Sequence, residues 1–60
     1  MKENILLVED EDSLRMTLGV RLRSAGYDVD TASGGVEGFR KATSRPYDLI
    51  ILDILLPDRS

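Results

Sequence analysis

The feature that most constrains the fold is the aliphatic run at residues 49–52, which Asp53 follows directly and Pro57 follows four residues after that. Four consecutive aliphatic residues, two of them β-branched, predict a strand buried on both faces. A carboxylate at the end of such a strand is costly unless a partner stabilises its charge. Pro57 cannot donate to a sheet ladder, so regular pairing is expected to end before it. The run therefore predicts that a buried strand delivers Asp53 to a site that uses its charge.

Length and composition limit the possible functions. The chain has 60 residues and neither Cys nor His, which excludes disulfides, zinc clusters built on these ligands and imidazole catalysis. Hydrophobic residues make up 42% and charged residues 32%, as in a soluble globular chain. The net charge of −3, with scattered basic residues, does not favour nucleic-acid binding by this segment. Because no apolar run approaches a membrane span and no signal-peptide pattern is present, we expect a cytoplasmic location without membrane contact.

The first part of the chain predicts a strand followed by a helix. Residues 4–8 form a second continuous aliphatic run, again expected to be buried on both faces, and acidic residues follow it. Over residues 13–25 the pattern becomes helical, with Asp12 or Ser13 as the cap and Gly26 as the stop. One stripe of this helix is expected to lie in the core: Leu14, Leu18, Leu22 and Ala25.

The middle of the chain predicts a strand and a weaker helix. Residues 27–32 alternate in polarity, as in a strand with one more exposed face. Residues 34–43 predict a helix that Ser33 caps, with a narrow apolar face built around Phe39. Its three glycines each weaken it by about 1 kcal/mol relative to Ala. The glycine-rich start of this helix is not a G-x-G-x-x-G motif, so nucleotide binding is disfavoured.

The resulting β-α-β-α-β order predicts an α/β fold with a parallel sheet, its strands at about residues 4–8, 27–32 and 49–53. With a strand order of 2-1-3, the first and third strands are neighbours, and ligands bind beyond their carboxyl ends. Glu9 and Asp10 leave the first strand at this edge and Asp53 leaves the third, so three carboxylates are expected to converge. The nearby sequence offers no arginine at the same strand ends that would compensate these charges, and a hard cation such as Mg²⁺ is the simplest remedy. A carboxylate beside such an ion can attack a phosphoryl group.

Four motifs occur in order along the chain: Ile5-Leu6-Leu7-Val8-Glu9-Asp10-Glu11, Gly26-Tyr27-Asp28-Val29, Tyr47-Asp48-Leu49-Ile50 and Leu52-Asp53-Ile54-Leu55-Leu56-Pro57. Together they resemble the receiver domain of two-component response regulators. The resemblance covers the whole chain and implies a flavodoxin-like, doubly wound parallel sheet. Residues 1–60 would be its N-terminal half, and we expect a fragment that ends in a loop and is completed by dimerisation or by swapping of the last strand.

The resemblance also implies roles for individual residues. Asp53 would be the phosphoacceptor, taking phosphate from a sensor histidine kinase or a phosphotransfer protein. Mg²⁺ would be held by Asp10 directly, by Glu9 through a water molecule, by Asp53 and by the backbone carbonyl of Leu55. The family's Ser or Thr, its Lys and its aromatic switch residue belong to the half that this sequence does not include. We therefore expect no complete phosphotransfer activity, and no enzyme, from these residues alone.

Three further interpretations stay open. Met16 and Val20 lie one turn apart on the helix side away from the leucine stripe, and are either incidental exposed residues or, by the resemblance, a kinase-docking surface. A bare outer side of the third strand would favour a homo-oligomer, that is, a self-assembling structural fragment with a vestigial acidic site. Its interface would be formed around Ile50, Ile51, Leu52 and Ile54. A Mg²⁺-dependent phosphohydrolase would usually carry a second Asp at the position of Leu55, so that class is disfavoured.

Overall fold

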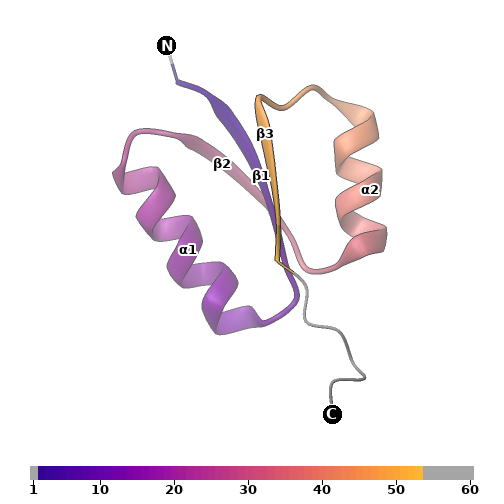
Figure 1. Cartoon of the computed structure of the whole chain (residues 1–60), viewed down its shortest axis with the longest axis horizontal. Coiled ribbons are helices and arrows are strands. Elements are labelled where there is room, and N and C mark those ends of the chain that lie inside the picture. Colours follow the sequence, from indigo (N-terminus) through magenta and orange to yellow (C-terminus); the bar gives the residue numbers. More distant parts are fainter. Residues whose placement is uncertain (1, 54–60) are drawn as a thin grey trace.

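The computed structural model describes residues 2–53, with the backbone alone at Asp53, and residues 1 and 54–60 lie outside that description. Three parallel strands form a sheet in the order β2-β1-β3, and the two helices lie on opposite faces of it (Figure 1). This confirms the predicted α/β fold and the strand order, and every predicted boundary lies within one residue of the observed one. The elements are β1 (Asn4–Glu9), α1 (Asp12–Ser24), β2 (Asp28–Ala32), α2 (Gly35–Ser44) and β3 (Leu49–Asp53).

The core is built on β1. Its residues from Ile5 to Val8 are each 3% exposed or less, because β1 is paired on both edges and covered on both faces. Successive side chains of a strand point to opposite faces. Leu6 and Val8 pack on the α2 side with Ala32, Ala42 and Tyr47, so Ile5 and Leu7 face α1. The prediction of a first strand buried on both faces is confirmed.

The contact of α2 with the sheet depends on a glycine. Gly38 is buried, and a Cβ built on it would lie 2.9 Å from Cγ2 and 3.1 Å from Cγ1 of Val8. The helix therefore approaches β1 more closely than any side chain at this position would allow. The predicted apolar face around Phe39 is wrong, because Phe39 is 71% exposed while Gly38 and Ala42 face the sheet.

The leucine stripe of α1 is covered only in part. The covered line of this helix runs through the half-buried Arg15, Leu18 and Leu22 and the buried Gly19. These four positions follow one another at helical spacing, so they set the side of α1 that meets the sheet. Leu14 and Ala25, both predicted to be core residues, lie at the margin of this line and are exposed.

The ends of the helices are formed by backbone groups more than by side-chain caps. The N-cap positions are Glu11 for α1 and Gly34 for α2, neither with a side-chain cap, so the caps predicted at Asp12 or Ser13 and at Ser33 are wrong. At the end of α1 the predicted glycine stop is confirmed, since Gly26 has φ 104°. The amides of Gly26 and Tyr27 bond back to the carbonyls of Arg23 and Leu22 at 3.0 and 3.2 Å, which is a Schellman motif.

The third strand differs from its prediction in burial. Ile50 is 47% and Leu52 is 67% exposed, so burial on both faces is wrong for β3. Strand β3 lies at one edge of the sheet, and the main helix–strand contacts in the described part of the chain are with β1 and β2. The aliphatic run thus has the composition of a buried strand without the cover. This agrees with the expectation of a bare outer side.

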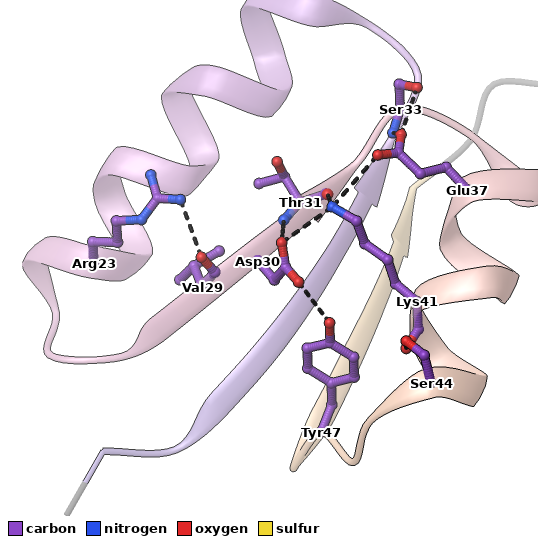
Figure 2. A network of polar contacts seen from close by, with 9 residues as sticks. All are labelled: Arg23, Val29, Asp30, Thr31, Ser33, Glu37, Lys41, Ser44 and Tyr47. Atoms are coloured by element: carbon purple, nitrogen blue, oxygen red, sulfur yellow. Dashed lines mark hydrogen bonds and ion pairs between the residues drawn. The ribbon is translucent and has the colours of Figure 1, made fainter.

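A polar network connects β2, α2 and the segment that enters β3 (Figure 2). The Asp30 carboxylate accepts hydrogen bonds from the Tyr47 hydroxyl at 2.7 Å, the Lys41 ammonium at 3.2 Å and the Thr31 amide at 3.0 Å. Tyr47 precedes β3 by two residues, so this network helps to fix where β3 enters the sheet. The Tyr47 hydrogen bond is the main reason that the pKa of Asp30 lies below its usual range, with Lys41 and the Thr31 amide adding to it. Burial, followed by the Asp30 hydrogen bond, raises the pKa of Tyr47.

The contact between Gly38 and Val8 predicts opposite effects for two glycine substitutions. Ala is a better helix former than Gly by about 1 kcal/mol, but overpacking a core contact costs about 1–3 kcal/mol. We expect Gly38→Ala to lower the free energy of unfolding by about 1 kcal/mol. Gly19→Ala is the control, because the nearest atom to its added Cβ is the flexible end of Arg23 at 3.4 Å. In urea denaturation Gly19→Ala should be neutral or stabilising, and equal stabilisation by both variants would contradict the close approach.

The network around Asp30 predicts a pH dependence of stability. The pKa of Asp30 is lower in the folded than in the unfolded chain, so its contribution is present above about pH 4 and is lost as the pH falls below that. The pKa of Tyr47 is raised, so its contribution is lost as the pH rises beyond about 10. We expect Tyr47→Phe to cost about 1 kcal/mol at neutral pH and to flatten both flanks of the stability curve. Denaturation from pH 2 to 11 tests this, with Tyr27→Phe as the control that should keep both flanks.

Candidate metal and phosphoacceptor site

The carboxyl ends of β1 and β3 lie side by side at one edge of the sheet. Glu9 is opposite Asp53 in the parallel register, and Asp10 follows Glu9 directly. Both helices begin near this edge, α1 on one face and α2 on the other (Figure 1). The chain leaves β1 toward one face and returns from the other before β3, which is a topological switch point. The structure therefore brings the backbone of the predicted acidic residues together as expected.

Glu9 is held in place by its surroundings. It is the last residue of β1 and only 1% exposed, the one charged residue buried in the described part of the chain. Its Oε2 accepts a hydrogen bond from the Glu11 amide at 2.9 Å, which closes the turn between β1 and α1. A carboxylate in this position is costly to bury unless its oxygens are bound. Its place at the strand end makes it a fixed part of the edge.

Asp10 has the opposite character. It lies in the turn after β1 and is exposed, so its carboxylate is open to solvent at the edge where β1 and β3 end. An exposed acid next to a buried acid gives the edge one carboxylate that is accessible to a metal ion and one that is held in place. Carboxylate oxygens are the ligands that Mg²⁺ prefers, and Mg²⁺ keeps several waters when few protein ligands are offered. The donor chemistry of these residues fits that ion.

Arg15 belongs to this region and was missed from the sequence. Its Nη1 donates to the Glu9 carbonyl at 2.9 Å, and its Nη2 pairs with Asp12 at 2.7 Å. Arg15 thus binds the backbone carbonyl of one strand-end acid, while its ion pair is with Asp12. The expectation that no arginine compensates the strand-end carboxylates stays a prediction. Side chains of a helix lean toward its N-terminus, so Arg15, one turn into α1, reaches back to the end of β1. The lean of helical side chains toward the N-terminus is therefore the sequence-based argument from which the contact of Arg15 with the end of β1 could have been predicted.

The remaining predicted ligands lie beyond what the structure describes. The Asp53 side chain and the whole of Leu55 are outside the described residues. Among the side chains that are described, no three His, Cys, Asp or Glu residues gather closely enough to hold a metal ion.

Met16 and Val20 are both exposed on α1. They lie on the side of the helix away from the covered line, where the sequence places them. The structure therefore leaves their surface accessible, and their role in docking stays a prediction.

Comparison with known proteins identifies the family. The model of the response regulator receiver domain matches residues 5–60. The chain belongs to the response regulator receiver family. The resemblance inferred from the strand-end motifs is thereby confirmed. Neither helix in the described part of this receiver chain has the length and hydropathy of a membrane span.

Curated proteins similar to the receiver chain are transcriptional and response regulators. It is 47% identical over 57 residues to the alkaline phosphatase synthesis transcriptional regulatory protein PhoP of Bacillus subtilis, covering 95% of this chain and 24% of the relative. It is 51% identical over 53 residues to the response regulator ArlR of Staphylococcus aureus, covering 88% of this chain and 24% of the relative. The receiver chain thus spans about a quarter of the length of these relatives.

A solved structure shows the same fold. The Vibrio cholerae chemotaxis protein CheY4 matches all of the receiver chain with a TM-score of 0.86 and 35% identity, over 50% of its own length. The β2-β1-β3 sheet with one helix on each face is thus part of a CheY-like, flavodoxin-like fold.

Proposed function

We propose that this receiver chain carries the phosphoacceptor of a two-component signalling pathway and that the acceptor is Asp53. The observation that supports this most directly is the register of β1 and β3, which sets Asp53 opposite Glu9 at the open edge of the sheet. Membership of the receiver family supports the same conclusion. The phosphodonor would be the phosphohistidine of a sensor kinase or of a phosphotransfer protein, in the cytoplasm. This segment has no proposed role in binding nucleic acid.

The proposed reaction is a transfer between two side chains. A carboxylate oxygen of Asp53 attacks phosphorus, and the phosphorus–nitrogen bond of the phosphohistidine breaks. The bonding electrons remain on the imidazole, which takes up a proton, and Asp53 becomes an acyl phosphate. Mg²⁺, when bound, would supply positive charge that offsets the charge of the phosphoryl oxygens.

Four groups would hold that ion. Asp10 would bind it directly, Glu9 through a water molecule, and Asp53 and the Leu55 carbonyl would add oxygen atoms. The buried and constrained carboxylate of Glu9 suits an indirect role, because the Glu11 amide already occupies Oε2. The exposed Asp10 suits direct ligation. Arg15 would set the turn that carries both acids, through its bond to the Glu9 carbonyl.

Docking of the kinase is proposed at Met16 and Val20. Both are exposed and one turn apart on α1, whose N-terminus lies at the same edge as the acidic residues. A partner seated there would lie beside the phosphoacceptor edge.

The proposed acceptor is tested by acetyl phosphate labelling of the polypeptide that carries this sequence, purified at its native length, with Mg²⁺. We expect one phosphoryl group per chain by mass spectrometry, and its complete loss in Asp53→Asn, because the amide cannot act as the nucleophile. Asp28→Asn is the control, because Asp28 begins β2 and lies at the other end of the parallel sheet from Asp53. This variant should label like the unaltered protein. Labelling that survives in Asp53→Asn would overturn the assignment.

The proposed metal site is tested by Mg²⁺ titration followed by NMR. The titration should shift the amide signals of Asp10 and Asp53, and Asp10→Asn should weaken that response at least tenfold.

A second candidate is a self-assembling structural role with a vestigial acidic site. Its support is an open apolar hollow that is lined in part by Phe39 of α2 and by Ile50 and Leu52 of β3. All three of these side chains are exposed. A two-fold dimer that joins this surface to its copy would cover it on both chains at once. Residues Ile50, Ile51 and Leu52 would form the centre of that interface, and Ile54, also predicted there, lies outside the described residues.

Sedimentation equilibrium of the 60-residue chain tests this candidate. We expect a mass about twice that of the monomer at micromolar concentration, and a return toward the monomer in Leu52→Lys. Val36→Lys, at an exposed position outside the hollow, should keep the dimer. A folded monomer at that concentration would contradict the structural role and would leave the phosphoacceptor proposal unaffected.

A further inference from the structure

The outer edge of β2 has a defined set of backbone groups. The Asp28 amide donates to the Glu3 carbonyl at 3.0 Å, so Asp28 faces β1. Because backbone groups of successive strand residues point to opposite edges, Asp30 and Ala32 also face β1, while Val29 and Thr31 face outward. Strand β2 is at the end of the sheet order, so these outward groups are not used by a neighbouring strand within the described chain.

Two cationic side chains, one from each helix, occupy the carbonyls of this edge (Figure 2). Arg23 of α1 donates from Nη2 to the Val29 carbonyl at 3.1 Å. Lys41 of α2 donates from Nζ to the Thr31 carbonyl at 2.6 Å. The Thr31 amide is bonded as well, to Oδ1 of Asp30 at 3.0 Å. Three outward polar groups of β2 thus have side-chain partners, from opposite faces of the sheet.

Lys41 is held in this position by its neighbours. Its ammonium contacts Asp30 at 3.2 Å and Glu37 at 3.4 Å, and its side chain is half-buried. Glu37 is in turn fixed by the amide and the hydroxyl of Ser33, both at 2.9 Å. A lysine that only covered a solvated surface would not need this support. Its bond to the Thr31 carbonyl is therefore a built feature of the edge.

We propose that Arg23 and Lys41 form a clasp that keeps the outer edge of β2 from pairing with β2 of a second copy of this chain. Unpaired edge strands are templates for association, and cationic side chains on the edge are a way to prevent it. Antiparallel pairing about a two-fold axis at Asp30 would set Val29 of one copy opposite Thr31 of the other. Both residues point outward, so each such pair would exchange two backbone hydrogen bonds. The clasp occupies the carbonyls that this pairing would use.

The charge of Asp30 is a second factor that opposes this pairing. Asp30 of each copy would meet its equivalent at the axis, where like charges repel. Lys41 compensates Asp30, so its loss alone would expose that repulsion while freeing the edge. An informative variant therefore removes both cations and the charge of Asp30 together.

The test compares two triple variants with the same change in net charge. Arg23→Met, Lys41→Met and Asp30→Asn open the edge, whereas Arg21→Met, Arg40→Met and Asp28→Asn change exposed positions on the same three elements. By sedimentation equilibrium we expect the first variant to reach about twice the mass of the unaltered chain at equal concentration. The control should match the unaltered chain. Amide exchange at Val29 and Thr31 should slow at least tenfold in the first variant as it associates.

Two results would overturn the clasp. One is a folded first variant, by circular dichroism, with the mass of the unaltered chain. The other is association without added protection at Val29 and Thr31, which would place the contact elsewhere, for example on β3. If the triple variant does not fold, Arg23→Met alone decides the question, because it frees the Val29 carbonyl and leaves the α2 network intact. Its association should then exceed that of Arg21→Met, and equal masses would reject the proposal.

Discussion

The burial of β1 on both faces and both edges is the constraint on which the rest of the structure depends. Its residues from Ile5 to Glu9 are almost without exposure, and both other strands pair with it. A chain of this length buries a limited share of its surface, so one fully enclosed strand accounts for most of the available core. The charged residue of that strand, Glu9, lies at its carboxyl end, where the Glu11 amide binds it. Enclosing β1 therefore also sets the position of the acidic edge.

The two helices reach the sheet in different ways, and the contacts of α2 extend to the segment that enters β3. On one face Gly38 lets α2 approach Val8 directly, and the Asp30 network joins α2 to Tyr47 just before β3. On the other face α1 meets the sheet at Gly19, and Arg15 extends back to the end of β1. The entry of β3 is thus fixed by a polar network, and its register with β1 then sets Asp53 opposite Glu9. The alignment of the candidate site is a consequence of contacts at the far end of the sheet.

The order of elements and the acidic edge could be predicted from the sequence because they depend on local patterns. Continuous aliphatic runs, helical spacing and Gly26 are each readable over a few residues, and the parallel topology follows from their order. The predictions that failed concern how far β3 is covered by neighbouring elements and which side of each helix faces the sheet. Neither property is contained in a local sequence pattern. The run in β3 has the composition of a buried strand, but its exposure depends on what lies beside it. The exposure of Phe39 and Leu14 follows from which side of each helix is brought closest to the sheet by Gly38 and Gly19. Arg15 was overlooked because its contact depends on side-chain direction and not on spacing.

The two edge strands of the sheet differ in their exposed groups: the outward carbonyls of β2 are hydrogen-bonded, whereas β3 exposes apolar side chains. The outward carbonyls of β2 are bound by Arg23 and Lys41, and its sequence places acids at Asp28 and Asp30. The edge strand β3 carries Ile50 and Leu52, whose exposed apolar side chains gain by being covered. With the proposed clasp at β2 and exposed apolar side chains at β3, pairing with a further strand would be expected at β3 and not at β2. CheY4, which matches this chain over half of its own length, shows that the same three-strand arrangement occurs within a larger fold. The exposed apolar surface of the sheet thus lies on β3, the strand whose register with β1 sets Asp53 opposite Glu9, and not on β2.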